Sequence, residues 1–254
     1  MSVLETIKLA KKLNEQGQID LKKGTILSSN IVTGYALNVP IYGTCKPTKV
    51  CAKNCYAAIP HKPIAMKVAQ TKQMKVYNTI KADPQGVSEK IVRELRGKVS
   101  KGSVKFLRWN GVGDLFEESI ECLTAVADAL PQLSLWVVTR IPEQASKVPH
   151  RENVFVHFSL DASSLDRYDK TLELNPLSKN LFFSYTADDG EIEPPSRVFD
   201  LPLSVFFSNL YSKEPSELLA KVSCPLNGAK DLTSMCESCG RCWNGEAVKM
   251  REAR

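Results

Sequence analysis

The chain has 254 residues, 43% hydrophobic and 24% charged, and its 34 lysines and arginines against 28 acidic residues give a formal net charge of +6. These values are typical of a globular protein with a sizeable core and exclude a disordered chain. The basic excess is mild and spread along the chain, so it permits an anionic partner such as nucleic acid without requiring one.

The N-terminal stretch, residues 1–16, mixes lysine and glutamate with apolar residues at helical spacing. This pattern predicts a helix rather than a signal peptide or a membrane span. We therefore expect a cytoplasmic protein with no membrane partner.

Three cysteines follow the first predicted strand, which covers residues 25–35. Cys45, Cys51 and Cys55 lie in a loop with glycine, proline and lysines, and such a loop can fold its thiolates around a metal. Three thiolates are one fewer than a closed zinc site or a fully ligated cubane cluster requires. Either another residue, such as His61, completes a zinc site, or one coordination position stays open for a ligand.

Downstream, apolar runs of β type alternate with helical patterns. Strands are expected at 104–109, 133–139, 154–160, 181–186 and 203–208, and helices at 61–82, from Ser88, and at 117–130, 163–174 and 215–221. With the first strand this makes six strands, most of them separated by a possible helix, a pattern typical of βα units on a parallel sheet. In such a sheet the active site lies at the carboxyl ends of the strands.

Several residues just past predicted strands are candidates for binding. Arg140 can hold a carboxylate of a ligand through two parallel donors. Gly111 and Gly113 can let the backbone approach a ligand with Asp114 as an acceptor, or they can form a plain strand-to-helix turn that Asp114 caps. Within the strand 154–160, His157 is expected to be a hydrogen-bonded core residue, with an inward polar residue near the substrate as the alternative.

The remaining cysteines form a second group and a singlet. Cys122 lies in an apolar helical pattern and is predicted to be a core residue. The other four are separated by eleven, two and two residues: Cys224, Cys236, Cys239 and Cys242. Four thiolates can close a centre, and three cysteines within seven residues are the ferredoxin-like way of wrapping a cubane, whereas zinc usually takes separated pairs. We expect an iron–sulfur cluster here, with zinc as the alternative, and disulfides at neither group.

The succession of these features resembles the radical S-adenosylmethionine (SAM) enzymes. A three-cysteine loop after the first strand, a glycine-rich turn after the second and the segment 154–161 at the end of the fourth follow the family's order over residues 28–210. The segments 30–34 and 239–243 also resemble phage-encoded proteins of the same superfamily. The chain is thus expected to be a divergent, phage-type member, although its cysteine spacing of five and then three residues is wider than the usual three and two.

This resemblance implies a fold and a division of the chain. The fold is α/β, a partial (βα)6 barrel of the radical SAM type over residues 25–212. A helical N-terminal segment, 1–24, precedes it. A small cysteine-rich extension, 213–254, follows the barrel and would carry an auxiliary cluster.

The resemblance also implies cofactors and contacts. Cys45, Cys51 and Cys55 would hold a [4Fe–4S] cluster whose open iron binds SAM, and reductive cleavage of SAM would give a 5′-deoxyadenosyl radical that abstracts hydrogen from an unidentified substrate. A flavodoxin or ferredoxin would donate the electron. The contacts expected with SAM, apart from Arg140, are Tyr56 on the adenine, Gly111, Gly113 and Asp114 on the amino group, and Ser159 and Asp161 on the ribose or methionyl part. Asp161 can instead cap the helix expected near Ser163.

Two other functions remain open from the sequence. The chain can be a non-catalytic zinc- or iron–sulfur-binding phage accessory module that binds protein or nucleic acid. It can also be a barrel derived from radical SAM enzymes that no longer cleaves SAM.

Overall fold

The structure is a computed structural model. It describes residues 17–53, 55, 57, 63–174, 181–187, 195, 203–207, 224, 235–240 and 242–243. The helices expected at 1–16 and 215–221 lie outside these residues. Within 17–24 the chain forms a turn rather than a helix, since the Gly24 N–H donates to the Asp20 carbonyl at 2.6 Å.

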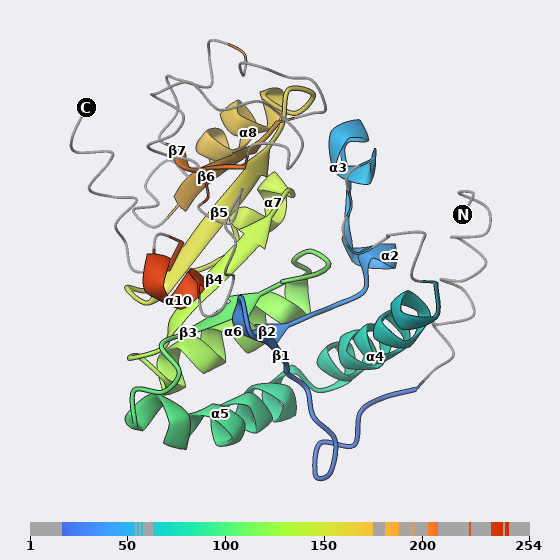
Figure 1. Cartoon of the computed structure of the whole chain (residues 1–254), viewed down its shortest axis with the longest axis vertical. Helices are drawn as coiled ribbons and strands as arrows, with labels where there is room; N and C mark the ends of the chain where they lie inside the picture. Colours follow the sequence, from blue (N-terminus) through green and yellow to red (C-terminus); the bar gives the residue numbers. More distant parts are fainter. Residues whose placement is uncertain are drawn as a thin grey trace.

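Seven strands form one sheet in sequence order (Figure 1). They are β1 (Ser28–Asn30), β2 (Gly34–Leu37), β3 (Phe106–Trp109), β4 (Ser134–Thr139), β5 (Val154–Leu160), β6 (Leu181–Thr186) and β7 (Leu203–Phe207). β1 is antiparallel to β2, whereas β2 to β7 are all parallel. The predicted α/β class and the parallel sheet are therefore confirmed. The sheet has its edges at β1 and β7 and is not closed by the strands that the structure describes.

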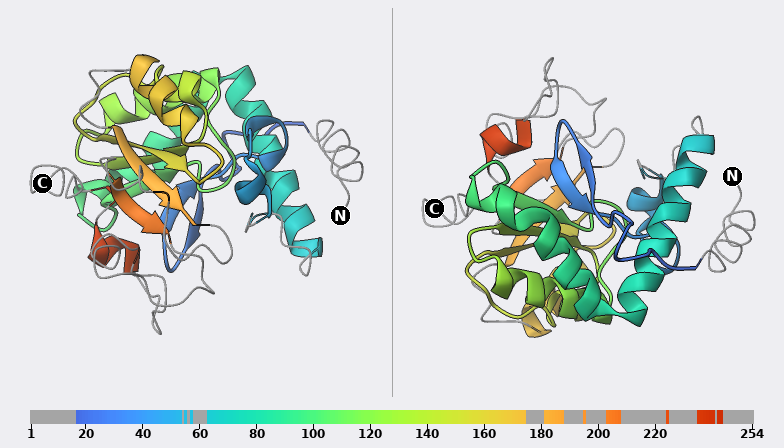
Figure 2. Two further views of the ribbon diagram at one scale, coloured as in Figure 1. Left: turned by 90° about the horizontal axis from the view of Figure 1, so that it is seen from above. Right: turned by 90° about the horizontal axis from the view of Figure 1, so that it is seen from below.

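The helices connect successive strands. Between β2 and β3 lie α2 (Ile41–Thr44), α3 (Lys49–Lys53), α4 (Pro63–Ala82) and α5 (Pro84–Ser100). Further along come α6 (Glu117–Ala129), α7 (Pro142–Ala145), α8 (Asp166–Leu174) and, near the C-terminus, α10 (Met235–Cys239). Figure 2 shows α5 and α6 on one face of the sheet and α10 on the opposite side. We call these two sides the outer face and the inner face.

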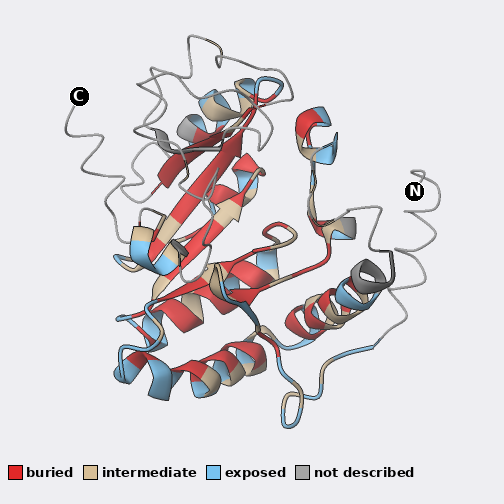
Figure 3. Ribbon diagram, in the orientation of Figure 1, coloured by how far each residue is buried: buried red, intermediate tan, exposed pale blue. Residues whose placement is uncertain are grey.

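The outer face carries the main hydrophobic core. Leu107, Trp109, Val137 and Phe158 are fully buried there against the apolar sides of α5 and α6. Apolar residues recur every three or four positions in both helices, which places them on one side. Figure 3 shows this burial along the central strands and one side of α5.

The inner face is covered differently. Phe106 and Trp136 form a small second cluster with Trp243, whose ring stacks on Phe106 at a centroid distance of 4.8 Å. The Cys236 N–H also donates to the Val32 carbonyl at 3.4 Å. The described residues of the C-terminal region therefore pack on the inner face, near the amino end of β3.

The first predicted strand is wrong in its extent. Residues 25–35 do not form one strand, because the Asn30 side chain accepts hydrogen bonds from the Val32 and Thr33 N–H groups at 2.9 and 2.7 Å and closes a turn. The result is the hairpin of β1 and β2, with Ile31 66% exposed at its tip. A β-branched run predicted the strand, but local capping by Asn30 decided the structure.

The second helix begins earlier than Ser88. α5 starts at Pro84, where proline is tolerated, and the Asp83 side chain accepts from the Gly86 N–H at 2.8 Å as the N-cap. The other expected strands and helices agree with the described elements to within about three residues. In the part of the chain that is described, no helix is long and apolar enough to cross a membrane.

The N-cap of α5 gives a stability prediction. Replacing Asp83 by alanine should lower the free energy of unfolding by about 1 kcal/mol, because the Gly86 N–H loses its acceptor. Urea denaturation of the purified chain measures this, with the exposed Lys101→Ala as a control that should change it little. Equal stability of the two variants would show that Asp83 is not an effective cap.

Candidate functional site

The three-cysteine loop lies at the carboxyl edge of the sheet. Cys45 is the C-cap of α2, Cys51 lies within α3 and Cys55 follows it. Burial raises the pKa of Cys45 to about 12, and the charges of Asp114, Cys51 and Cys55 add to this effect. Burial also raises the pKa of Cys51, while the positive charge of Arg140 opposes the shift. The structure therefore brings the three thiols within electrostatic reach of one another and of three predicted strand-end residues: Asp114, Arg140 and Asp161.

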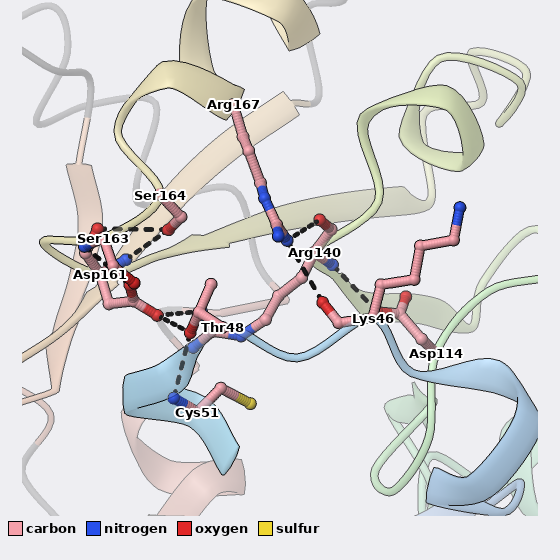
Figure 4. A network of polar contacts seen from close by, with 9 residues as sticks. All are labelled: Lys46, Thr48, Cys51, Asp114, Arg140, Asp161, Ser163, Ser164 and Arg167. Atoms are coloured by element: carbon pink, nitrogen blue, oxygen red, sulfur yellow. Dashed lines mark hydrogen bonds and ion pairs between the residues drawn. The ribbon is translucent and has the colours of Figure 1, made fainter. Parts of the chain in front are cut away.

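Asp161 ties this loop to the sheet, as Figure 4 shows. Its Oδ2 accepts hydrogen bonds from the Thr48 hydroxyl and, at 2.7 Å, from the Arg140 guanidinium. Its Oδ1 accepts from the Ser163 N–H at 3.0 Å and from the Ser163 hydroxyl at 2.7 Å. Thr48 in turn accepts from the Cys51 N–H at 3.1 Å, as an N-cap of α3 does. The carboxylate thus holds the cysteine loop, the end of β4 and its own turn together.

These contacts decide the ionisation of Asp161. Burial alone would raise the pKa of this carboxyl, but the donors Thr48 and Ser163 and the charge of Arg140 outweigh burial and hold its pKa below the ordinary value. A carboxylate has about four acceptor positions, and all are used by the chain. Asp161 closes the turn at Ser163 and does not cap a helix, so the prediction of a helix cap near Ser163 is wrong: α8 begins only at Asp166. The expected contact of Asp161 with the ribose or methionyl part of SAM would need one of these hydrogen bonds to break.

Arg167 adds a second tie at the same place. Its Nη1 donates to the Lys46 carbonyl at 3.3 Å and to the Arg140 carbonyl at 3.2 Å (Figure 4). One guanidinium on α8 thus binds backbone from both the cysteine loop and the end of β4.

Asp114 is buried behind the loop, 4% exposed. Its carboxylate accepts from the Thr139 hydroxyl at 2.6 Å and from the N–H groups of Leu115 and Arg140 at 2.8 and 3.2 Å. Burial raises the pKa of Asp114 to about 6, against the opposing effect of these donors. Asp114 does not cap α6, whose N-cap is Phe116, so that prediction is wrong. It connects the turn after β3 to the end of β4 instead.

The two glycines pack against the end of β2. A Cβ on Gly111 would lie 2.5 Å from Asn38 Oδ1, and one on Gly113, which has φ +85°, would lie 2.5 Å from the Val39 carbonyl oxygen. The backbone pairs of this turn are Gly111 N–H to Leu37 O and Val39 N–H to Val112 O. Both positions therefore need glycine for the close approach of two chain segments.

The other predicted SAM contacts have different outcomes. Ser159 lies on the inner face in register with Ser184, is 7% exposed, and its hydroxyl makes no hydrogen bond to a described residue. Tyr56 lies outside the described residues, as does His61, the residue that could complete a zinc site.

The C-terminal cysteines form a separate group at the other end of the sheet. Burial raises the pKa of Cys236 to about 11 and raises that of Cys242 further, and the charges of the neighbouring thiolates, Cys224 and Cys239 among them, add to both shifts. The positive charge of Arg108 opposes both upward shifts without cancelling them. Four thiols and one cation thus share this region.

His157 joins this group to the inner face. Its Nε2 lies 3.0 Å from the Cys242 carbonyl oxygen, and burial lowers the pKa of the imidazole to about 4. The ring is therefore neutral near pH 7 and donates to the carbonyl, so the predicted core role is confirmed. Cys122 is fully buried in the outer-face core, also as predicted.

Neither thiol group is drawn tightly around one point. Among the described side chains, no set of three His, Cys, Asp or Glu is arranged to hold a metal ion. The assignment of both centres therefore depends on the number and the placement of the thiols.

Sequence reasoning missed two residues of this site. Thr48 and Arg167 bind predicted residues or their backbone. Thr48 had a local signal, because it lies three residues before Cys51 at a capping distance, whereas Arg167 depends on contacts between distant segments. Thr139 is expected at this edge as the neighbour of Arg140 at a strand end, but its bond to Asp114 is not predicted by the sequence.

Comparison with known proteins gives a family. A family model described as Gene product 88 matches residues 4–245, which is most of the chain. Neither the comparison with curated proteins nor that with solved structures found a match.

The Thr48–Asp161 bond should show energetic coupling. In a double-mutant cycle with Thr48→Val and Asp161→Asn, we expect a coupling free energy of about 1–3 kcal/mol, because the bond is buried and one partner is charged. Urea denaturation of the four chains measures it. Pairing Thr48→Val with the exposed Asp128→Asn is the control and should be additive; additivity in both pairs would refute the coupling.

Asp114 should make stability depend on pH. Its pKa is about 6 in the folded chain and about 4 when unfolded, so folding takes up a proton between these values. Its contribution to stability should therefore fall by roughly 2 kcal/mol as pH rises from about 4 to about 6.

Asp114→Asn should remove this slope. Unfolding free energies measured at several pH values for wild type and variant give the difference. Asp128→Asn is the control, because the hydrogen bond from Arg151 holds the pKa of Asp128 below the ordinary value and outside this window. A slope that survives in Asp114→Asn would assign it to another group.

Proposed function

The chain belongs to the Gene product 88 family, and we propose that it is a radical SAM enzyme. The observation that carries this proposal is the position of the three-thiol group at the carboxyl edge of a parallel sheet, beside the oppositely charged side chains of Arg140 and Asp114. In parallel α/β sheets this edge is where ligands bind.

The residues fit a cluster with one open iron. Cys45, Cys51 and Cys55 supply three thiolates and lie within electrostatic reach of one another, and the fourth position of a cubane would remain for a ligand. A cubane occupies more space than a single ion, so its thiolates need not converge on one point. The Thr48–Asp161 bond fixes the helix that carries Cys51 and would thereby hold the Cys51 thiolate in place on the cluster.

Arg140 and Asp114 fit the two charges of an amino acid. Only one guanidinium nitrogen of Arg140 is bonded to Asp161, and its other N–H groups can donate to a carboxylate. Asp114 keeps one acceptor position beyond its three bonds, and its pKa of about 6 leaves it mostly ionised at neutral pH. An ammonium group of SAM would bind there and its carboxylate at Arg140.

The fold and the second centre complete the proposal. Six parallel strands in sequence order, without a reversal of direction along the sheet, are compatible with a partial (βα)6 barrel whose interior is the inner face. Cys224, Cys236, Cys239 and Cys242 would hold an auxiliary [4Fe–4S] cluster, with zinc as the alternative. An electron donor such as a flavodoxin or ferredoxin is the expected partner.

In this proposal the chain orients SAM, excludes water and keeps Arg140 paired with Asp161. When bound, the cluster and SAM supply reductive cleavage of SAM. Arg140 and Asp114 orient the amino acid end of SAM by charge. The buried network around Asp161 excludes water from the base of the loop, and its pKa below the ordinary value keeps Arg140 paired near neutral pH.

The metal content of protein purified without oxygen tests the proposal. We expect about eight irons per chain, from two four-iron clusters, and formation of 5′-deoxyadenosine from SAM with a reductant. The triple variant with Cys45, Cys51 and Cys55 changed to alanine should lose about half of the iron and all 5′-deoxyadenosine. Cys122→Ala, a buried cysteine outside both groups, should keep both.

The other outcomes separate the alternatives. Zinc without iron would contradict the enzyme and favour the accessory module. Iron in wild type with no loss in the triple variant would show that these three cysteines hold no cluster.

A further inference from the structure

Buried polar atoms without partners gather around the carboxyl ends of β2 and β3. Across β2, β3 and β4, Ala36, Arg108 and Trp136 are aligned in register, and Asn38 and Asn110 follow two residues after Ala36 and Arg108. Five buried side-chain atoms here have no hydrogen-bond partner: Asn38 Oδ1, Arg108 Nε, both amide atoms of Asn110, and Trp136 Nε1. They are half of such atoms in the described residues.

The side chains of Asn38, Arg108 and Trp136 lie close to one another, and Asn110 directly precedes Gly111 beside them. The point where a Cβ of Gly111 would stand is 2.5 Å from Asn38 Oδ1 and 3.6 Å from Arg108 Cδ. The Arg108 guanidinium lies over the Trp136 ring at 4.7 Å, and no ion pair between described residues involves Arg108. A cation, the polar groups of Asn38 and Trp136, and a glycine with no side chain thus share one place, directly beside Asn110 in the chain.

Asn110 is the unusual member of this set. It is 3% exposed, and its φ of 57° is the only positive φ of a non-glycine residue in the described chain. The left-handed region favours glycine, and a buried amide with neither atom bonded is unfavourable. Both features oppose folding stability, and such sites are typical of ligand binding.

We propose that Asn38, Arg108, Asn110 and Trp136 form the subsite for a substrate that carries a carboxylate beside an amine or amide N–H, as an amino acid or a peptide C-terminus does. Arg108 and the Trp136 N–H donate to the carboxylate. The Asn110 and Asn38 oxygens accept from the N–H group of the substrate. Four of the five unpartnered atoms then have partners, and Asn110 Nδ2 is left to donate to the same carboxylate.

Charge selects a carboxylate over a phosphate. Arg108 is the one cation of the subsite, and it also faces the thiols of Cys236 and Cys242. A phosphate monoester carries nearly two negative charges at neutral pH, whereas a carboxylate carries one. A single cation matches the smaller charge.

The subsite lies on the face between the two thiol groups. Arg108 is near the C-terminal cysteines, and the turn that begins at Asn110 leads to Asp114 beside Cys45. As a substrate assignment the inference rests on the proposed function, because it names the substrate class of that enzyme. Binding at the subsite is nevertheless measurable without any SAM cleavage.

Binding of simple probes to the full-length chain tests the inference. The probes are the free L-amino acids, a set of tripeptides with either a free or an amidated C-terminus, and S-adenosyl-L-homocysteine, titrated by calorimetry into protein purified without oxygen. We expect at least one probe with a free carboxylate to bind and its amidated counterpart not to bind. Asn110→Gly should weaken this binding at least tenfold.

Stability distinguishes ligand binding from a structural role. Asn110→Gly should have a Tm equal to or above that of wild type, because glycine accepts φ 57° and removes two unpartnered atoms. Gln144→Ala is the matched control, since Gln144 also has a buried oxygen without a partner but lies in α7, and it should bind the probe as wild type does.

Three results would overturn the inference. They are no binding of any probe by wild type, a lower Tm with unchanged binding in Asn110→Gly, and binding only of S-adenosyl-L-homocysteine, which would assign the subsite to the methionyl end of SAM. Probe binding without iron or 5′-deoxyadenosine would instead retain a carboxylate site while removing the proposed function.

Discussion

The carboxylate of Asp161 is the contact on which the arrangement of the site depends. It accepts from Thr48, which is 113 residues away in sequence, from Arg140 at the end of β4 and from Ser163 in its own turn. An ionised, fully buried carboxylate is stable only when it is paired and hydrogen-bonded. Because all four acceptor positions are filled by the chain, loss of any donor leaves a buried charge with fewer partners. The cysteine loop is therefore attached to the sheet by an interaction that tolerates little change.

The sheet keeps the two thiol groups apart. The first group interacts with residues that follow β3 and β4, whereas the second lies against Phe106 at the start of β3 and His157 in the middle of β5. Parallel strands place all their carboxyl ends at one edge, so the two groups face different ends of the same inner face. For this reason no described cysteine of the second group is placed to complete the ligand set of the first.

The sequence predicts much of the fold and part of the site. Apolar runs such as 154–160 gave strands that the structure confirms, because strands buried on both faces need continuous apolar residues. The strand predicted at 25–35 and the helix predicted from Ser88 were wrong in extent. In both places a single side chain, Asn30 or Asp83, accepts hydrogen bonds from nearby backbone N–H groups. The placement of Arg140 and Asp114 near the cysteine loop follows from strand order. Thr139, next to Arg140, follows from strand order too. The bonds of Thr139 to Asp114 and of Thr48 to Asp161 do not, because pairing across the sheet edge leaves no periodic pattern.

The half-buried thiols at each end of the sheet have one arginine beside them. Burial raises the pKa of Cys45 to about 12 and of Cys236 to about 11, so the chain alone keeps these thiols protonated near neutral pH. Arg140 and Arg108 each lower the pKa of a neighbouring thiol, but one cation does not offset burial in either group. Within the proposed function, metal binding must then release protons, and most of the compensating positive charge comes from the metal. The two arginines supply the rest of this positive charge, since each lies beside one centre. Their unused N–H groups are then free to donate to a ligand.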